Sequence, residues 1–260
     1  MNLIEGLKEY SVEVNENKIS CLCKHNPASR ELIFFIHGLA CSKESFRNLF
    51  DKDYFPGKSL LVPDLLGFGR STKPVKFSYR MEEQARLIEE LLLLLPECKY
   101  HIVAHSMGAA VALLFNDDFY SRVLSFANIE GNLISEDCGL LSRSIAAVSI
   151  EDYKNKLYGK HSRLFKGHSQ LRFEESNPEI IYKSAKSLVE WSDSGILLDK
   201  FKNLNCKKSY FYGEENNNMP VLKELNFISK YVISKSGHGM MTENPNEFYT
   251  KLADFIYSNE

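Results

Sequence analysis

The chain has 260 residues, of which 44% are hydrophobic, 25% are charged and 12% are aromatic. This composition is that of a globular protein and excludes the disordered and collagen-like classes. The 32 basic and 34 acidic side chains leave a net charge of −2. We therefore expect no nucleic-acid partner, because the excess of basic residues that such binding needs is absent.

The sequence shows no segment that would direct the chain to a membrane or out of the cell. Its N-terminal stretch carries acids and lysines, without the apolar run of a secretory signal. The run of leucines at Leu91–Leu95 is far shorter than the roughly 20 residues of a membrane span. The six cysteines are scattered, which is typical of free thiols in a reducing compartment. We expect a cytoplasmic protein.

Strand patterns recur along the chain, and the first two form a predicted hairpin across the turn at Asn15–Asn17. Leu32–Ile36 is a continuous apolar run, typical of a strand buried on both faces of a parallel sheet. In chain order, the predicted strands are Tyr10–Val14, Lys18–Cys23, Leu32–Ile36, Ser59–Val62, Tyr100–Ala104, Val123–Ile129, Lys208–Tyr212 and Tyr231–Ser234.

Helical patterns alternate with these strands. Helices are predicted over Met81–Leu95, where Pro96 would end the helix, and over Asn246–Tyr257. A third, rich in alanine, is predicted to follow Ser106 and to end near Phe115. Strands that alternate with helices indicate an α/β fold with a mostly parallel sheet.

The stretch 132–205 interrupts this alternation, because it is polar and helical and contains no buried-strand run. Helices are predicted there over Leu140–Val148 and Ile180–Trp191. We expect a core of residues 1–131 and 206–260, with residues 132–205 inserted as a helical cap. The candidates for an apolar acyl pocket are Tyr158, Phe165, Phe173, Trp191 and Met240.

The segment Ala104–Gly108 (AHSMG) lies between a buried strand and a helix. A serine in the sharp turn between them would project its hydroxyl from the carboxyl edge of the sheet. The small residues on either side, Ala104 and Gly108, suit the close approach of strand and helix backbones in such a turn. Ser106 is therefore the candidate nucleophile, and the N–H of Met107 lies beside it.

Two glycine-containing loops supply the remaining groups for acyl-transfer chemistry. His37-Gly38-Leu39 follows a buried strand, so the N–H of Leu39 is predicted to form an oxyanion hole with that of Met107. His238, between Gly237 and Gly239, follows the last predicted strand. A histidine at the carboxyl edge of the sheet is within reach of Ser106 and is the candidate general base.

The order of these motifs resembles that of the α/β-hydrolase fold family. His-Gly follows the third strand, the segment Asp64–Ser71 (DLLGFGRS) follows the fourth, and the serine turn and Gly-His come later. The resemblance extends from about Leu32 to Tyr257 and implies an eight-stranded, mostly parallel sheet flanked by helices. It also implies a Ser–acid–His triad, and the helical cap expected over residues 132–205 would follow the sixth strand.

The acid of the triad departs from the commonest pattern of the family, in which an Asp stands three residues after a Gly that follows the penultimate strand. Here that Gly is Gly213, and the position of the Asp is occupied by Asn216. Some members carry the acid after the sixth strand instead, where this chain has Glu130. Glu130 is the favoured acid, Glu214 and Glu215 are alternatives, and a site without an acid is the last. On this interpretation Asn216→Ala should change the rate little.

The favoured function is that of a serine hydrolase without cofactor or metal. It would cleave a carboxylic ester or thioester of a small to medium, partly apolar molecule through an acyl-enzyme. The serine argues against the dehalogenase and epoxide-hydrolase branches, which use an aspartate nucleophile. The alternatives are a carbon–carbon bond hydrolase of the same fold and a catalytically silent, hydrolase-like protein that binds a small ligand.

Overall fold

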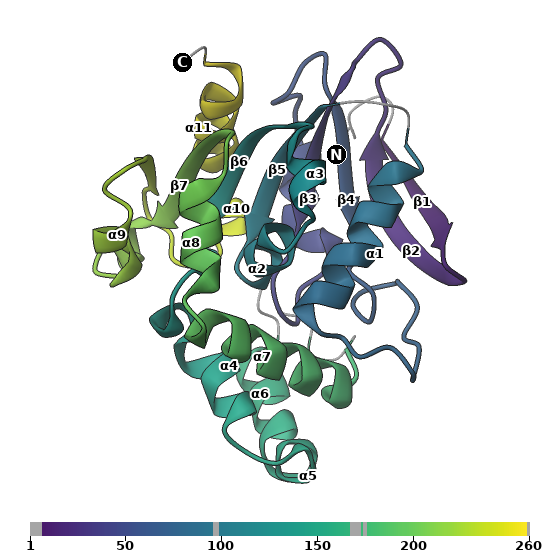
Figure 1. Cartoon of the computed structure of the whole chain (residues 1–260), viewed down its shortest axis with the longest axis vertical. Coiled ribbons are helices and arrows are strands. Elements are labelled where there is room, and N and C mark those ends of the chain that lie inside the picture. The colour runs from purple at the N-terminus through teal and green to yellow at the C-terminus, as the bar shows by residue number, and fades with distance from the viewer. Residues whose placement is uncertain (1–6, 96–98, 167–172, 174–175, 259–260) are drawn as a thin grey trace.

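The structure is a computed structural model and describes residues 7–95, 99–166, 173 and 176–258. Its eight strands form one sheet in the order β1-β2-β4-β3-β5-β6-β7-β8 (Figure 1). The strands are β1 (Leu7–Val14), β2 (Asn17–Lys24), β3 (Glu31–Ile36), β4 (Ser59–Pro63), β5 (Lys99–His105), β6 (Val123–Ile129), β7 (Lys207–Gly213) and β8 (Ser229–Ile233). The predicted eight-stranded sheet is confirmed.

The sheet is mostly parallel. β1 pairs with β2 and β2 with β4 in the antiparallel sense, and every later pair is parallel. The loops that follow β3, β5, β6, β7 and β8 therefore leave from the same edge of the sheet. The candidate catalytic and oxyanion-hole residues named from the sequence lie in or next to these loops.

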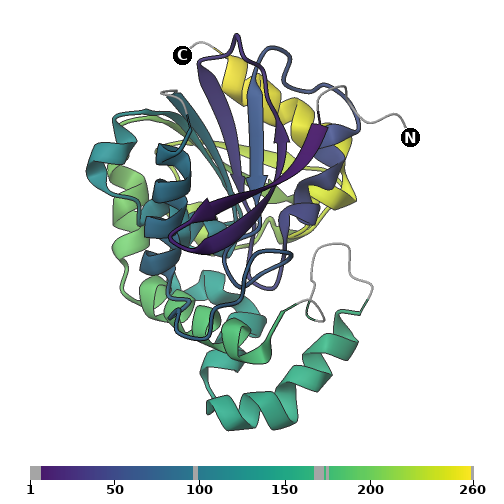
Figure 2. The same ribbon diagram turned by 90° about the vertical axis from the view of Figure 1, so that its right-hand side faces the viewer.

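Helices cover both faces of the sheet, as the turned view shows (Figure 2). Side chains of β3 alternate between two hydrophobic clusters: Phe34 and Ile36 pack in one, Ile33 and Phe35 in the other. This is why the strand reads as a continuous apolar run in the sequence. The helices on the first side are α1 (Met81–Leu93), α2 (Met107–Leu113) and α8 (Ile196–Asn203), and on the second are η1 (Lys43–Phe50), α10 (Met240–Glu243) and α11 (Pro245–Tyr257).

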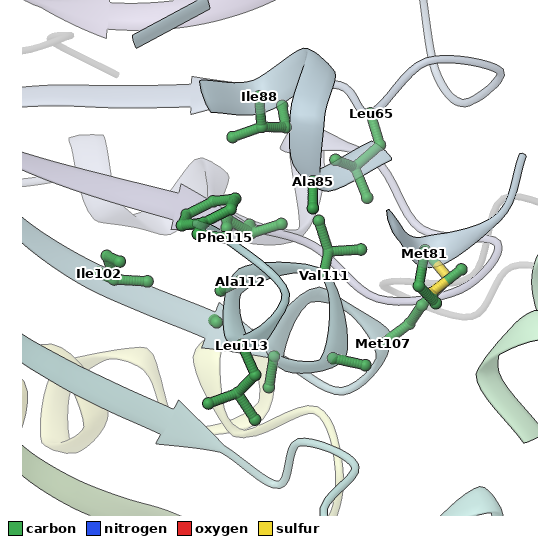
Figure 3. Close-up of a cluster of buried hydrophobic side chains, with 14 of the residues drawn as sticks. Leu65, Met81, Ala85, Ile88, Ile102, Met107, Val111, Ala112, Leu113 and Phe115 are labelled. Atoms are coloured by element: carbon green, nitrogen blue, oxygen red, sulfur yellow. The ribbon is translucent and has the colours of Figure 1, made fainter. Parts of the chain in front are cut away.

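The core beside the serine turn is packed between α1, α2 and β5. Met107 and Val111 of α2 lie close to Met81 and Ala85 of α1, while Ile102 comes from the strand beneath (Figure 3). All five side chains are fully buried. The start of α2, where the candidate nucleophile lies, therefore rests on a filled core that leaves it little freedom to move.

Most predicted elements are confirmed within a few residues, and two differences have physical causes. The 3₁₀ segment η1 was not predicted: it spans only eight residues, and although Phe46, Leu49 and Phe50 recur at helical spacing, Phe46 has non-helical angles. The last strand begins at Ser229, two residues earlier than predicted, since its first residues are exposed and polar. Pro96 and Cys98 lie outside the described residues.

A run of helices separates β6 from β7, as the sequence predicts. It comprises η2 (Ser135–Cys138), α4 (Gly139–Ala146), α5 (Ile150–Asp152), the π-helical turn η3 (Tyr153–Leu157), α6 (Tyr158–Leu164), α7 (Pro178–Asp193) and α8. Helices α4, α6 and α7 lie beyond the carboxyl edge of the sheet (Figure 1). Within the described residues, no helix combines the length and apolar character needed to cross a bilayer. The elements η5 (Glu214–Asn216), α9 (Val221–Glu224) and α3 (Asp117–Tyr120) complete the fold.

Candidate active site

Ser106 lies in a tight turn between β5 and α2. Its φ of 53° and ψ of −124° are unusual for a residue with a side chain, so the backbone is strained here. The turn brings α2 so close to β3 that a Cβ on Gly108 would lie 2.5 Å from the carbonyl oxygen of Ile36. A side chain does not fit at this position, which is why a glycine stands two residues after the serine.

The loop after β3 lies directly against Ser106. A Cβ on Gly38 would be 3.0 Å from Cβ and 3.4 Å from Oγ of Ser106. Leu39 lines the same cavity as the serine, and Met107 is the first residue of α2, where an N–H has no acceptor within the helix. The two backbone amides predicted to form an oxyanion hole therefore come from the segments that flank the hydroxyl.

The side chain of His37 fixes the peptide that carries the Leu39 amide. Its Nδ1–H donates to the carbonyl oxygen of Gly38 at 2.8 Å, and its Nε2 accepts the N–H of Leu65 at 2.9 Å. The ring is fully buried, and desolvation holds its pKa below the ordinary value, so it is neutral. His37 has no access to a substrate, and its contribution is to the orientation of the Gly38–Leu39 peptide.

Glu130 and His238 form the hydrogen-bonded pair of the site. Nδ1 of His238 lies 2.8 Å from Oε2 of Glu130, at the end of β6. Because a carboxylate only accepts, Nδ1 carries the proton and leaves Nε2 free as an acceptor. Glu130 is 3% exposed, whereas the His238 side chain is 51% exposed. Glu130 also has a positive φ of 41°, a second strained residue at the carboxyl edge.

Two further groups hold the carboxylate of Glu130. The N–H of Gly213 donates to Oε1 at 2.8 Å. The Asn216 Nδ2 lies 3.0 Å from Oε1 and 2.9 Å from Oε2. With His238, these contacts occupy the four acceptor positions of the carboxylate. The Asn216 contact could not be found from the sequence, because two residues 86 positions apart in different loops share no local pattern.

These contacts explain the ionisation of Glu130. Burial alone would raise the pKa of this carboxyl group. The hydrogen bond and charge of His238, the Gly213 N–H and the Asn216 amide outweigh burial and hold its pKa below the ordinary value. Glu130 is therefore a carboxylate at neutral pH although it is almost completely buried.

The pKa of His238 moves in the opposite direction. Desolvation favours the neutral ring, but the hydrogen bond and charge of Glu130 raise the pKa above its ordinary value. The charges of Glu243 and Asp137 act in the same sense. The imidazolium that would form when this histidine takes a proton is thus stabilised by three carboxylates.

His105 contacts His238, although the sequence pattern shows it only as a member of the serine motif. The two rings lie 4.6 Å apart between centroids, and Nε2–H of His105 donates to the backbone oxygen of His238 at 3.0 Å. Burial holds the pKa of His105 well below its ordinary value. A neutral ring on the strand of the nucleophile therefore supports the loop that carries His238.

Ser106, Glu130 and His238 line one cavity of about 550 Å³. Its apolar wall includes Phe165, one of the five residues proposed for an acyl pocket. The other apolar lining residues are Leu39, Cys41, Cys138, Leu141 and Met219, and the other acidic ones are Glu136, Asp137, Glu215 and Glu243. The wall of the cavity is therefore partly apolar, and none of the described lining residues is Lys or Arg.

The structure separates the alternative acids from the histidine pair. Glu214 accepts the backbone N–H of Lys235 at 2.9 Å. Glu215 is exposed at the cavity, and its carboxylate lies near Gly237. The carboxylate that hydrogen-bonds Nδ1 of His238 is that of Glu130. Among the described residues, no group of three or more His, Cys, Asp or Glu side chains could hold a metal ion.

Known proteins resemble this chain in sequence and in fold. Residues 31–147 match a family model described as the alpha/beta hydrolase fold. A lipase of Moraxella sp., Lipase 3, is 36% identical over 96 residues, which cover 36% of this chain and 30% of the lipase. The matches to the first curated relatives cover only 26–35% of their lengths.

Solved structures resemble the chain over nearly its full length. The N-acyl homoserine lactonase AidH superposes with a TM-score of 0.74 at 16% identity and covers 98% of both chains. The haloalkane dehalogenase DatA from Agrobacterium tumefaciens superposes with a TM-score of 0.75 at 18% identity, also over 98% of both. At such identities the likeness shows the fold alone. Together with the sheet order and the matched family model, it shows that this chain has the α/β-hydrolase fold.

Proposed function

We propose that the protein is a serine hydrolase that cleaves a carboxylic ester or thioester through an acyl-enzyme. Ser106 Oγ attacks the carbonyl carbon, and Nε2 of His238 takes the hydroxyl proton and returns it to the leaving group. Water then hydrolyses the acyl-enzyme by the same route. The observation that carries the proposal is that Ser106, on a strained strand–helix turn, shares a cavity with the hydrogen-bonded pair of His238 and Glu130.

Each remaining group has a role in this mechanism. Glu130 keeps His238 in the tautomer with a free Nε2 and stabilises the imidazolium that forms during attack. The amides of Leu39 and Met107 would bind the oxyanion, a contribution of roughly 3–4 kcal/mol per donor in comparable sites. Neither role requires a metal or a cofactor.

The substrate is proposed to be a small to medium, partly apolar ester, in keeping with a relative named as a lipase. We propose that the helices of the cap, residues 132–205, select the acyl group, since Leu141 and Phe165 contribute to the cavity wall. The carboxylates at the cavity favour a neutral or cationic molecule over an anionic one.

Labelling with a fluorophosphonate probe tests the proposal directly. We expect a fast adduct on Ser106, identified by peptide mass spectrometry, that is lost in Ser106→Ala and strongly slowed in His238→Ala. The unlabelled protein should hydrolyse nitrophenyl esters or thioesters, and labelling should abolish that activity. Absence of an adduct on folded protein would contradict the proposal, whereas an adduct without ester turnover would favour the carbon–carbon bond hydrolase.

The pH dependence provides a second test. His238 acts as a base only when it is neutral, and its pKa is raised above the ordinary value. The rate of ester hydrolysis should therefore rise with pH. The midpoint of this rise should lie above about 6.5, the pKa of an unperturbed histidine. A midpoint below that value would contradict the proposed pairing of His238 with Glu130.

A further inference from the structure

Asn216 stands where the fold commonly has its acid, and its side chain faces the carboxylate that replaces that acid. Because both oxygens of Glu130 are acceptors, the atom that meets them at 3.0 and 2.9 Å is the amide nitrogen with its two protons. One NH₂ group thus spans the two oxygens of one carboxylate. This is a specific contact between two loops, made at the centre of the candidate site.

The backbone holds Asn216 in place. It is the last residue of η5, and its carbonyl oxygen accepts the N–H of Met219 at 3.2 Å. The preceding residue, Glu215, donates its N–H to the carbonyl oxygen of Ser236 at 3.1 Å, which ties η5 to the loop of His238. Asn216, Glu130 and His238 are therefore held relative to one another by three loops at one edge of the sheet.

We propose that Asn216 is a positioning residue whose neutral amide keeps Glu130 oriented toward Nδ1 of His238, so that positions 130 and 216 tolerate only one carboxylate between them. This inference rests on the proposed function only for its effect on the rate. The contact itself is independent of catalysis.

The charges around the pair explain why a second acid would be harmful. Glu130 is 3% exposed, and its stabilising contacts are N–H groups and His238, without a Lys or Arg among the described ones. Two carboxylates about 3 Å apart repel each other, so both stay ionised only while a protonated His238 offsets their charge. Among the described residues, the titratable groups around Glu130 and His238 are Asp137, Glu243, His105 and Tyr210, with Glu136 and Glu215 on the wall of the same cavity.

The inference reverses the expectation that Asn216 matters little, and it gives Asn216→Asp an effect that depends on position 130. With Glu130 present, the added charge should raise the pKa of His238. The rising limb of the pH–rate profile would then move to higher pH, and kcat/KM at pH 7 would fall about tenfold for each pH unit that the limb moves. With Glu130→Gln, the same substitution restores a carboxylate near the histidine and should raise kcat/KM at least tenfold.

The test is a double-mutant cycle of Asn216→Asp and Glu130→Gln, measured as kcat/KM across pH. The matched control is Asn217→Asp, which adds the same charge at the next residue, an exposed one. The inference is supported if Asn216→Asp lowers kcat/KM with Glu at position 130 and raises it with Gln there, while Asn217→Asp shows no such change of sign. An effect of Asn216→Asp that is the same with Glu and with Gln at position 130 overturns it.

A second measurement does not depend on activity. The ring of His238 is titrated by NMR in Ser106→Ala protein, with and without Asn216→Asp, and its signal is assigned by its loss in His238→Gln. We expect Asn216→Asp to raise the pKa of His238 and Asn217→Asp to change it little. Equal changes in the two variants would overturn the inference, while failure of the proposed function would show separately as a missing fluorophosphonate adduct.

Discussion

The loops at the carboxyl edge of the sheet differ from the helices inserted between β6 and β7 in how closely their backbone is packed. A Cβ on Gly108, Gly131 or Gly213, which belong to the edge loops or border them, would meet another atom at 2.5, 2.1 or 2.3 Å. In the insertion, a Cβ on Gly139 or Gly195 would meet nothing within 4 Å. The edge loops are therefore fixed by close backbone packing, whereas the insertion has room at Gly139 and Gly195.

Under the proposed function, this difference would separate the part of the molecule that carries out the reaction from the part that selects the substrate. The groups that must meet within hydrogen-bond distance, such as Glu130 and His238, come from the closely packed edge loops. The insertion contributes Phe165 and Glu136 to the cavity wall, where small displacements change fit rather than reaction. We therefore expect changes in the edge loops to affect rate or stability strongly and changes in the insertion to affect preference among substrates.

The largest effect is expected for Glu130→Gln. The variant keeps the shape of the side chain but removes the charge that stabilises the imidazolium of His238. Loss of the corresponding carboxylate in a comparable triad lowers the rate by about 10⁴, and we expect a similar fall in kcat at pH 7. A loss of less than tenfold, with fold intact by circular dichroism, would assign the acid elsewhere, to Glu214, Glu215 or no residue.

The second-largest effect is expected on the free energy of unfolding. Gly108→Ala places a methyl group 2.5 Å from the carbonyl oxygen of Ile36, and we expect a loss of about 1–3 kcal/mol in urea unfolding. Gly159→Ala in α6 is the matched control, because its nearest atom, Nη1 of Arg163, is 3.8 Å away. That variant should gain up to about 1 kcal/mol through helix propensity. Equal effects of the two variants would remove the contrast between the regions.

A smaller effect concerns the strain at the nucleophile. Both Ser106→Gly and Ser106→Ala remove the hydroxyl, but only glycine adopts a φ of 53° without strain. After allowance for the greater freedom of glycine in the unfolded chain, we expect Ser106→Gly to be more stable than Ser106→Ala by about 1 kcal/mol. Thermal unfolding of the two inactive variants decides the point, and a more stable alanine variant would argue against strain.

The smallest effect is expected at the cavity wall. Glu136 and Glu215 are exposed, so their influence on a charged substrate is screened by solvent. The double variant Glu136→Gln, Glu215→Gln should lower the preference for a choline ester over the uncharged 3,3-dimethylbutyl ester by about two- to fivefold at low salt. Glu224→Gln, on α9 and away from the cavity, should leave the ratio unchanged. A change in kcat for both esters alike would mean that the pair acts on the chemistry.

The parts of the molecule that have a local sequence pattern could be predicted from the sequence. The strands of the sheet, the turn at Ser106 and the loop of His238 each follow from residues within a few positions of one another. Glu130 was favoured because a carboxylate follows the sixth strand while Asn216 occupies the usual position. The contacts of His37 with Leu65, of His105 with His238 and of Asn216 with Glu130 could not be predicted, since each joins segments that only the folded sheet brings together.

The backbone links the nucleophile to the acid. The N–H of Ser106 donates to the carbonyl oxygen of Ile129, the N–H of Asn132 to that of Ser106, and the N–H of Glu130 to that of Phe211. Opening this edge, where β5 pairs with β6 and β6 with β7, would therefore release Ser106 and Glu130 together. In hydrogen-exchange terms, these amides form one cooperative unit that exchanges as a group, so the site is expected to be either wholly assembled or wholly open.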